Sequence, residues 1–298
     1  MEILLKTNNL TKRFKKTDAL NNVNMTIYRG DIYGFVGENG AGKSTLIRVV
    51  TNILRPTAGT FTLNVAKRLG SVGAIVESPA FHPGLTALQN LRYQSDLLGY
   101  KHTDEDLASM LDKVGLEEQR GSKKVVKNFS LGMKQRLSIA LTLLSNPEFI
   151  LLDEPMNGLD PAGIKEMRDL ILRLNKEGTT FLISSHILTE LDKVATRYGF
   201  ISHGELVEEI AVKDLAKKAK SYTEIILMQP LNDEVRELLK DFTYSEEGTA
   251  TLIFSQEEEA QKALKLLMGA EHFVSAFEVV RETIEDYYLQ KINKGVGA

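Results

Sequence analysis

The sequence predicts an α/β fold with a mixed sheet as its core, a helical subdomain inserted into that core, and a small α+β domain at the C-terminal end. Short apolar runs typical of buried strands recur through the first part of the chain and alternate with helical patterns. One such run, residues 31–36, leads into a glycine-rich loop that opens a helix at Lys43. Between about residues 86 and 145 the apolar spacing is helical throughout, which predicts the insertion.

Length and composition limit the class of protein. The 298 residues are 43% hydrophobic, which allows a sizeable core and about two domains. The 37 basic and 40 acidic residues give a net charge of −3, so nucleic acid is not expected as a partner. The absence of cysteine excludes disulfides and thiolate metal sites and fits a cytoplasmic location. We find no signal peptide and no run near the ~18 apolar residues of a membrane span, so work at a membrane would need a separate membrane-embedded partner.

The elements of the first domain, placed at residues 1–212, follow from local pattern. Period-two alternation or a short apolar run predicts a strand, three-to-four spacing predicts a helix, and Pro56 with Gly59 breaks the first helix. The helical subdomain is expected at about 78–147. The other expected elements are strands at 3–10, 20–28 and 31–36, a helix at 43–54, strands at 71–76 and 149–152, a helix at 162–175, and strands at 180–183, 199–201 and 205–207.

The second predicted domain covers residues 213–298. A basic helical stretch at 213–220 is interpreted as a linker. After it, strand and helix patterns alternate, which predicts a small α+β domain without a motif that indicates chemistry. The expected elements are strands at 222–228, 249–254 and 273–280 and helices at 233–240 and 257–268.

The glycine-rich loop has the context of a phosphate-binding loop, because it follows a predicted strand and precedes a helix. Its glycines let backbone N–H groups approach phosphates, its lysine places an ammonium against the β- and γ-oxygens, and Ser44 suits Mg²⁺. A glycine-rich turn without nucleotide is the alternative. The residues expected to hold the nucleotide are Gly37, Asn39, Gly40, Gly42, Lys43, Ser44 and Thr45.

Two further polar groups follow predicted buried strands. Asp153 and Glu154 come directly after residues 149–152, at the sheet edge where α/β proteins bind ligands. Asp153 would hold Mg²⁺, and Glu154 would accept a proton from the attacking water. His186 follows residues 180–185 and could contact the γ-phosphate. A solvated strand end and an isolated structural histidine are the alternatives.

A second anion-binding helix start is expected at residues 130–135, Ser-Leu-Gly-Met-Lys-Gln. The N-terminus of a helix binds phosphate through free backbone N–H groups and its dipole. Because residues 37–44 already supply one complete phosphate loop, this helix start would serve the nucleotide of another copy. The sequence therefore predicts an ATPase that dimerises.

Five motifs together resemble the nucleotide-binding domain of ABC transporters over about residues 1–212. The resemblance implies that Ser130 and Gly132 contact the γ-phosphate held by the opposing copy, with Gln135 in the same nucleotide site. It also implies that Asp160 lies in a loop at the dimer interface and that Phe14 stacks on adenine, although Phe14 could instead be a core residue. The motifs, in order, are residues 37–45, 130–135, 151–155, 157–160 and 185–186.

One position departs from the usual pattern of that family. Most members carry glutamine where this chain has Glu77, and residues 74–81 with 129–136 resemble the bacitracin-resistance and lantibiotic-immunity branch. By the resemblance Glu77 joins Ser44 and Asp153 around Mg²⁺ and reports to the membrane subunit. A carboxylate adds negative charge near the γ-phosphate, so we expect slow basal turnover. An ordinary loop glutamate is the alternative.

The resemblance implies a transport ATPase that uses ATP and Mg²⁺. Two cassettes, identical or different, would close around two nucleotides and couple hydrolysis to export of a peptide antibiotic or similar drug through a separate transmembrane permease. The completeness of the motifs favours a homodimer. The chain would lie in the cytoplasm, on the inner face of the membrane. A soluble ABC-type ATPase acting on ribosomes or DNA, and a phosphotransferase for small molecules, are the alternatives.

Overall fold

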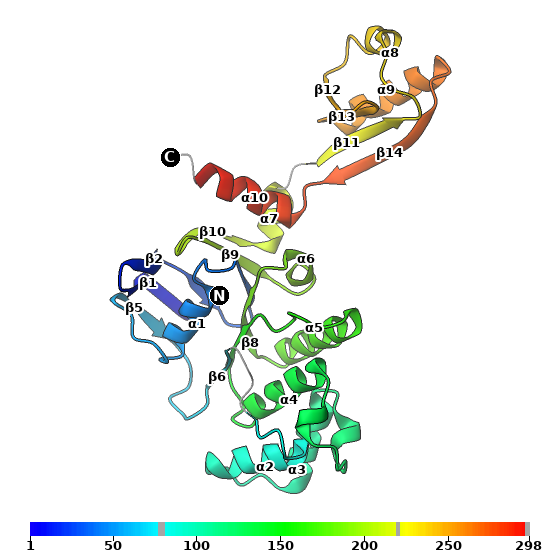
Figure 1. Cartoon of the computed structure of the whole chain (residues 1–298). Helices are drawn as coiled ribbons and strands as arrows, with labels where there is room; N and C mark the ends of the chain where they lie inside the picture. The colour runs from blue at the N-terminus through cyan, green and yellow to red at the C-terminus, as the bar shows by residue number, and fades with distance from the viewer. Residues whose placement is uncertain (77–80, 219–220, 296–298) are drawn as a thin grey trace. The chain divides into compact units, whose positions relative to one another are not determined.

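The computed structural model describes residues 1–76, 81–218 and 221–295, and within it the chain divides into two compact units. The first unit contains Met1–Asp214 and the segment from Lys291 onward, and the second contains Leu215–Gln290 (Figure 1). Each has its own cluster of buried apolar side chains. Among the described residues, no helix has both the length and the apolar character that crossing a bilayer requires.

A six-stranded sheet forms the core of the first unit, in the order β10-β9-β4-β8-β7-β6. All neighbouring strands are parallel except β10, which pairs antiparallel with β9 at the edge. Every residue of β4 and of β8 is buried, which explains why their sequences are continuous runs of small and apolar residues. The strands are β4 (Ile32–Val36), β6 (Val72–Ile75), β7 (Phe149–Asp153), β8 (Thr180–Ser185), β9 (Arg197–Ser202) and β10 (Glu205–Ala211).

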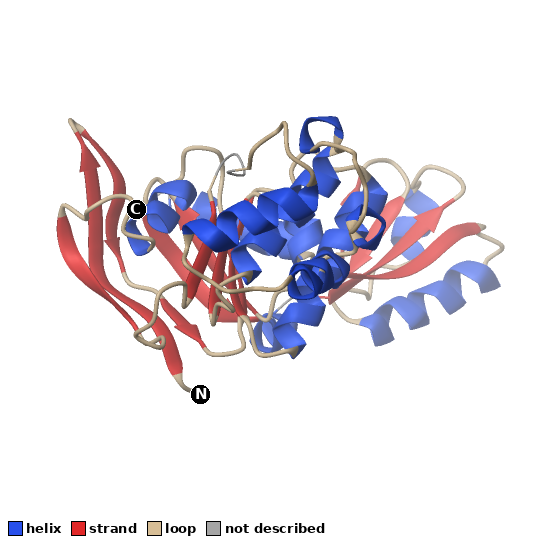
Figure 2. Cartoon of the chain, turned by 90° about the horizontal axis from the view of Figure 1, so that it is seen from below, coloured by secondary structure: helices blue, strands red, loops and turns tan. Residues whose placement is uncertain are grey.

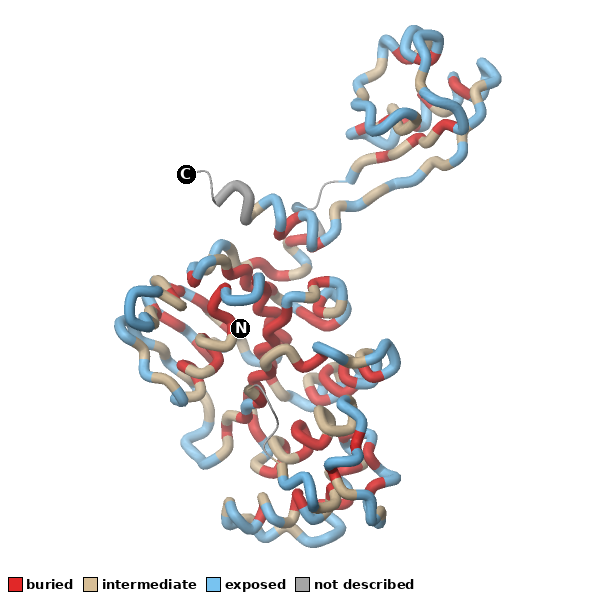
Figure 3. The backbone as a smooth tube through the Cα atoms, in the orientation of Figure 1, coloured by how far each residue is buried: buried red, intermediate tan, exposed pale blue. Residues whose placement is uncertain are grey.

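An antiparallel sheet and helix α1 contribute to the apolar core on one side of the six-stranded sheet, and α5 buries its own apolar stripe. The core includes Leu5 of β1, Ile47 of α1 and Leu151 of β7. Figure 2 shows the strands and helices of the chain, and Figure 3 shows in red the parts of the backbone whose residues are buried. Helix α1 ends at Val50 rather than at the expected Leu54, and Asn52 shortly after it has a left-handed backbone with φ of 59°. These elements are β1 (Ile3–Phe14), β2 (Thr17–Val23), β3 (Thr26–Tyr28), β5 (Ala58–Leu63), α1 (Lys43–Val50) and α5 (Pro161–Lys176).

Helices fill the stretch between β6 and β7. Thr86 and Thr103 cap their helices through reciprocal hydrogen bonds with Gln89 and Asp106, so each helix starts where its capping box stands in the sequence. The elements are α2 (Ala87–Leu97), α3 (Asp104–Lys113), the 3₁₀ turns η1 (Glu117–Gln119) and η2 (Val126–Asn128), and α4 (Leu131–Leu143), with the short α6 (Leu188–Leu191) and α7 (Val212–Lys218) later in the chain.

The second unit is an antiparallel sheet of four strands in the order β12-β13-β11-β14, with helices α8 and α9 between strands. The β-α-β-β-α-β chain order with this strand order is the ferredoxin-like arrangement. Strand β12 was not expected, because its four residues are half-buried or exposed and carry no alternating apolar pattern. The elements are β11 (Ser221–Leu227), α8 (Asp233–Leu238), β12 (Tyr244–Glu247), β13 (Thr251–Phe254), α9 (Glu257–Gly269) and β14 (Val274–Arg281), and α10 (Ile284–Gly295) follows.

Candidate active site

The glycine-rich loop joins the carboxyl end of β4 to α1, and the space around its backbone requires glycine at Gly37 and Gly42. A Cβ at Gly37 would lie 2.4 Å from the Ile201 carbonyl oxygen. A Cβ at Gly42 would lie 2.4 Å from the Ala19 carbonyl oxygen, and Gly42 also has φ of 113°. The backbone of the loop is therefore not covered by side chains at these positions, so a phosphate can approach its N–H groups closely.

Lys43 is the buried cation of this loop. Its side chain is 6% exposed, and its Nζ donates hydrogen bonds to the carbonyl oxygens of Gly37 at 2.6 Å and Glu38 at 3.1 Å. The same ammonium lies 3.3 Å from Oε1 of Glu154. Ser44 and Thr45 follow it in the first turn of α1 and are half-buried, whereas Asn39 and Gly40 are exposed.

Sheet register brings the three predicted strand-end groups together. Asp153 at the end of β7 lies level with Ser184 of β8, and Ser185 lies level with Val36, the last residue of β4 before the glycine loop. Because these strands are parallel and adjacent, Asp153, Glu154 and His186 all lie at the sheet edge where the loop begins.

Glu154 is held between two cationic or polar partners. Its Oε2 lies 2.8 Å from Nδ1 of His186, and its Oε1 faces Lys43 without a hydrogen bond from any residue that the structure describes. Glu154 also has a left-handed backbone, with φ of 50°, which is uncommon for a residue other than glycine. A strained backbone that aims a carboxylate at a lysine and a histidine fits a functional residue better than a solvated strand end.

Ser184 is a site residue that the sequence analysis did not identify. Its hydroxyl donates to Oδ1 of Asp153 at 2.6 Å and accepts the backbone N–H of Glu154 at 3.0 Å. The Ser184 carbonyl accepts the same N–H at 3.2 Å. One side chain therefore holds the carboxylate of Asp153 and the backbone of Glu154. No local pattern in the sequence marks this serine, because Thr180 and Ser185 of the same strand are also polar and its complete burial is seen only in the structure.

The residues can accommodate a nucleotide with its metal. Carboxylate and hydroxyl oxygens are the donors that Mg²⁺ prefers, and Asp153 and Ser44 supply them on neighbouring elements. Glu77, the third expected metal ligand, lies outside the described residues.

The predicted second helix start is at the N-terminus of α4. Ser130 is exposed and is the N-cap, accepting the Met133 N–H through its hydroxyl at 3.3 Å. Gly132 and Gln135 follow in α4 and are half-buried. Asp160 is the exposed N-cap of α5 and accepts the Gly163 N–H at 3.0 Å.

These two helix starts are close neighbours in the chain's own fold. A Cβ on Gly158 would lie 3.2 Å from Leu131, and one on Gly132 would lie 3.8 Å from Leu159. Further along α4, Arg136 pairs with Glu166 of α5 at 3.2 Å, as expected for a structural ion pair between neighbouring helices. The surface that contains Ser130 and Asp160 is therefore formed by two helix starts that pack against each other.

Phe14 lies at the end of β1 and is 44% exposed, so it is not the core residue that was the alternative interpretation. The ammonium of Lys12 lies 5.0 Å from the centre of its ring. An exposed aromatic ring with one face toward a cation is available for stacking.

Comparison with known proteins gives consistent results. A family model described as ABC transporter matches residues 20–157. The bacitracin transport ATP-binding protein BcrA of Bacillus licheniformis is 38% identical over 99% of both chains. The lantibiotic transport ATP-binding protein SrtF of Streptococcus pyogenes is 41% identical over 69% of this chain and 90% of its own. A bacterial ABC transporter cassette solved as a dimer is 27% identical, with a TM-score of 0.61 over 70% of this chain and 99% of its own.

These comparisons confirm the predicted α/β cassette and the resemblance on which the sequence analysis relied. The relatives are named as transport proteins, so they support the transporter interpretation and not the soluble ATPase acting on ribosomes or DNA. The chain, whose cassette binds nucleotide, belongs to the ATP-binding proteins of ABC transporters, which are ATPases.

Proposed function

We propose that this chain drives the export of a peptide antibiotic, or of a similar drug, through a separate transmembrane permease at the inner face of the cell membrane. The proposal rests on the observation that the relative named for bacitracin transport aligns with 99% of this chain. We also propose a cassette domain at 1–212 and an accessory domain at 213–298. The two separate apolar cores support this division, although the segment from Lys291 belongs to the first compact unit.

The glycine loop is proposed to hold the phosphates of ATP. Backbone N–H groups from Gly37 to Ser44 would donate to the phosphate oxygens, and Lys43 would exchange its loop carbonyl partners for the β- and γ-oxygens. Asn39 and Thr45 are assigned to the same site, and Phe14 to the adenine ring. Ser44, Asp153 and Glu77 are the proposed ligands of Mg²⁺, which would neutralise charge developing on the phosphate oxygens.

Glu154 is proposed as the residue that takes the proton from the attacking water. Its Oε1 already faces the Lys43 ammonium, beside which the γ-phosphate would lie. His186, 2.8 Å from the other oxygen, would fix the orientation of this carboxylate and contact the γ-phosphate. Ser184 would position Glu154 and Asp153 together through its two hydrogen bonds.

The exposed start of α4 is proposed to complete the site of a second copy. Leu131 is 45% exposed and the cap residue Ser130 is exposed as well, so this helix N-terminus is open to solvent. Ser130, Gly132 and Gln135 would act on the opposing nucleotide, and Asp160 would lie at the same interface. The full set of motifs in one chain favours a homodimer, and the dimeric cassette among the structural relatives supports the arrangement.

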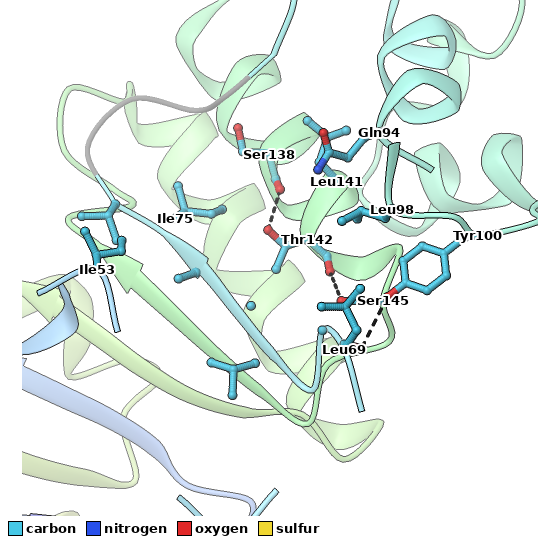
Figure 4. Close-up of a pocket in the computed structure, with 15 residues that line it drawn as sticks. Ile53, Leu69, Ile75, Gln94, Leu98, Tyr100, Ser138, Leu141, Thr142 and Ser145 are labelled. Carbon is cyan, nitrogen blue, oxygen red and sulfur yellow. Dashed lines mark hydrogen bonds between the residues drawn. The ribbon is translucent and has the colours of Figure 1, made fainter. Parts of the chain in front are cut away.

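A cavity of about 480 Å³ is proposed to receive the permease. It lies between the edge strand β6, the C-terminal end of α2 and one side of α4 (Figure 4). Ile53 and Leu69 at its rim are 61% and 70% exposed. On the same helix α2, Tyr93 and Leu97 line an adjoining hollow and are 46% and 66% exposed. Large apolar side chains that stay exposed around a hollow are typical of a binding surface for another protein.

Copurification tests this proposal. The tagged chain, isolated from gently solubilised native membranes, is expected to bring down a multi-span membrane protein, and bacitracin or a lantibiotic is expected to stimulate ATP hydrolysis by that complex. Leu97→Glu should abolish copurification, because it puts a charge in the apolar hollow that adjoins the cavity. Met268→Glu, at a residue that is 65% exposed in the second unit, is the matched control. Recovery without any membrane protein would contradict the proposal.

The carboxylate at position 77 makes a separate prediction. If the Glu77 charge slows turnover, Glu77→Gln should raise the basal ATPase rate several-fold, because an amide removes a negative charge near the γ-phosphate. Steady-state hydrolysis by the purified chain and by the complex measures this. Unchanged hydrolysis together with unchanged stimulation by substrate would leave Glu77 an ordinary loop residue.

A further inference from the structure

One lysine of the first unit lies between the aromatic ring at the end of β1 and the loop that follows α1. The ammonium of Lys12 donates a hydrogen bond to the Arg55 carbonyl oxygen at 2.8 Å and lies 5.0 Å from the centre of the Phe14 ring. Among the residues that the structure describes, no carboxylate pairs with this ammonium, and the side chain is half-buried. Its full positive charge therefore acts on the π face of Phe14.

The backbone next to Phe14 is anchored without the help of Lys12. The N–H of Arg13 donates to the Thr57 hydroxyl at 3.0 Å. The guanidinium of Arg13 donates to the Asp18 carboxylate at 2.8 Å. Because the strand end is held in this way, the freedom that remains to Phe14 is rotation of its side chain. Its ring is 44% exposed, so packing restricts that rotation only in part.

The lysine also connects the ring to the helix that begins at the phosphate loop. Arg55, whose carbonyl holds Lys12, follows α1, and the first residue of α1 is Lys43. Strand β1 pairs antiparallel with β2. The Ala19 carbonyl oxygen of β2 lies so near Gly42 that a Cβ on this glycine would be 2.4 Å from it. The ring therefore belongs to a strand pair that packs directly against the loop.

We propose that Lys12 is a positioning residue of the nucleotide site, which holds the Phe14 ring in the orientation that stacks on the base. This role rests on the proposed function, in which Phe14 stacks on adenine. The ammonium lies over one face of the ring, so the base stacks on the opposite face. A cation on one face draws π electron density toward itself, which makes the opposite face a better partner for an electron-rich purine. Lys12 acts through Phe14 and does not touch the nucleotide.

Binding of ligands with and without a base tests this role in the purified full chain. Lys12→Met keeps an unbranched apolar side chain but removes the ammonium. We expect it to weaken ATP binding about two- to fivefold, the effect of losing one exposed cation–π contact. Binding of tripolyphosphate, which has no base, should not change, and neither should kcat at saturating ATP. Titration calorimetry without Mg²⁺ measures both ligands while ATP is not hydrolysed.

Two further variants control for charge and for general damage to the fold. Lys16→Met removes an exposed lysine between β1 and β2, so it changes the net charge by the same amount near the same site. It should leave the affinity for ATP unchanged. Lys12→Arg should restore ATP binding to the wild-type value, because a guanidinium also binds the face of an aromatic ring and can donate to a carbonyl oxygen.

A double-mutant cycle shows whether Lys12 acts through the ring. Phe14→Ala alone should weaken ATP binding about fivefold or more, because one base stack is lost. Adding Lys12→Met to Phe14→Ala should weaken it no further. Additive effects, or equal weakening of tripolyphosphate binding by Lys12→Met, would overturn the proposal. Unchanged ATP binding in Phe14→Ala would contradict the proposed base site itself, whereas a loss in Phe14→Ala without one in Lys12→Met would overturn only the role of Lys12.

Discussion

The two units use their sheets in opposite ways. In the first unit, β4 and β8 are buried along their whole length, and the polar groups gather where adjacent parallel strands end. In the second unit, Thr223, Ile225 and Leu227 of β11 are buried and alternate with half-buried residues, so this central strand is fully covered on one face only. Parallel strands that end together concentrate reactive side chains, whereas neighbouring antiparallel strands end at opposite sides of a sheet and divide such residues between them.

The largest expected effect is a loss of ATP hydrolysis, which we assign to the first unit alone. Glu154→Gln should lower the ATPase rate about 10²–10⁴-fold while ATP still binds, because the amide cannot accept the proton of the water. The matched control is Glu148→Gln, just before the other end of the same strand, where the carboxylate pairs with Arg29 at 2.7 Å. Phosphate release and nucleotide binding, measured separately, check both variants. A rate for Glu154→Gln equal to that of the control would remove Glu154 from the mechanism.

Truncating a side chain in the core of the second unit tests whether the two units unfold independently. Phe254→Ala, in the apolar core of the second unit, should destabilise that unit by about 3–5 kcal/mol, because it leaves a cavity. ATP should raise only the unfolding temperature of the first unit, because ligand binding stabilises the part that holds it. Calorimetry with and without nucleotide measures both transitions. Phe273→Ala, at an exposed ring, is the control, and loss of ATP binding in Phe254→Ala would show that the units depend on each other.

Two glycines of the phosphate loop provide a smaller test. Gly40 and Gly42 both have left-handed backbones, with φ of 85° and 113°. A Cβ on Gly40 meets nothing within 4 Å, whereas one on Gly42 would meet the Ala19 carbonyl oxygen at 2.4 Å. Gly42→Ala should therefore cost about 1–3 kcal/mol more free energy of unfolding than Gly40→Ala. Denaturant titration of the nucleotide-free protein compares them, and equal losses would mean that space around the loop does not matter.

The smallest effect concerns a half-buried carboxylate of the first unit that is not assigned to catalysis. Burial raises the pKa of Glu209 above 4.5, although its carboxylate accepts hydrogen bonds from the Thr26 N–H at 3.0 Å and the Tyr33 hydroxyl at 2.8 Å. The folded state thus binds this proton more tightly than the unfolded state. The contribution of Glu209 to stability is greatest below the unfolded pKa and is lost as pH rises through the raised folded pKa.

Glu209→Gln should remove that loss, so the variant should gain stability relative to the wild type as pH rises, by on the order of 1 kcal/mol. Urea unfolding at pH 4 and pH 8 measures the difference between the two proteins. Glu205→Gln, on an exposed side chain of the same strand, is the control. A difference that does not vary with pH would show that Glu209 is not the titrating group.

Most elements of the cassette could be predicted from local sequence, and the prediction was less complete for the second unit. The strand-end positions of Asp153, Glu154 and His186 were predicted because buried parallel strands have nearly continuous apolar sequences. Ser184 was missed because a serine within such a run has no pattern that marks it before its partners are known. Strand β12 was missed because it is short, half-buried or exposed, and defined by pairing with β13 rather than by its own residues.

The sequence determined which residues can bind phosphate and metal, since the glycine spacing and the polar residues after apolar runs are local properties of the chain. The tertiary structure decided which of these residues contact one another. The contacts of Glu154 with Lys43 and with His186 join residues far apart in the chain and depend on β4, β7 and β8 lying in register. The hydrogen bond from Lys12 to the Arg55 carbonyl likewise joins residues far apart in the chain. Such pairings are long-range, and no local pattern encodes them.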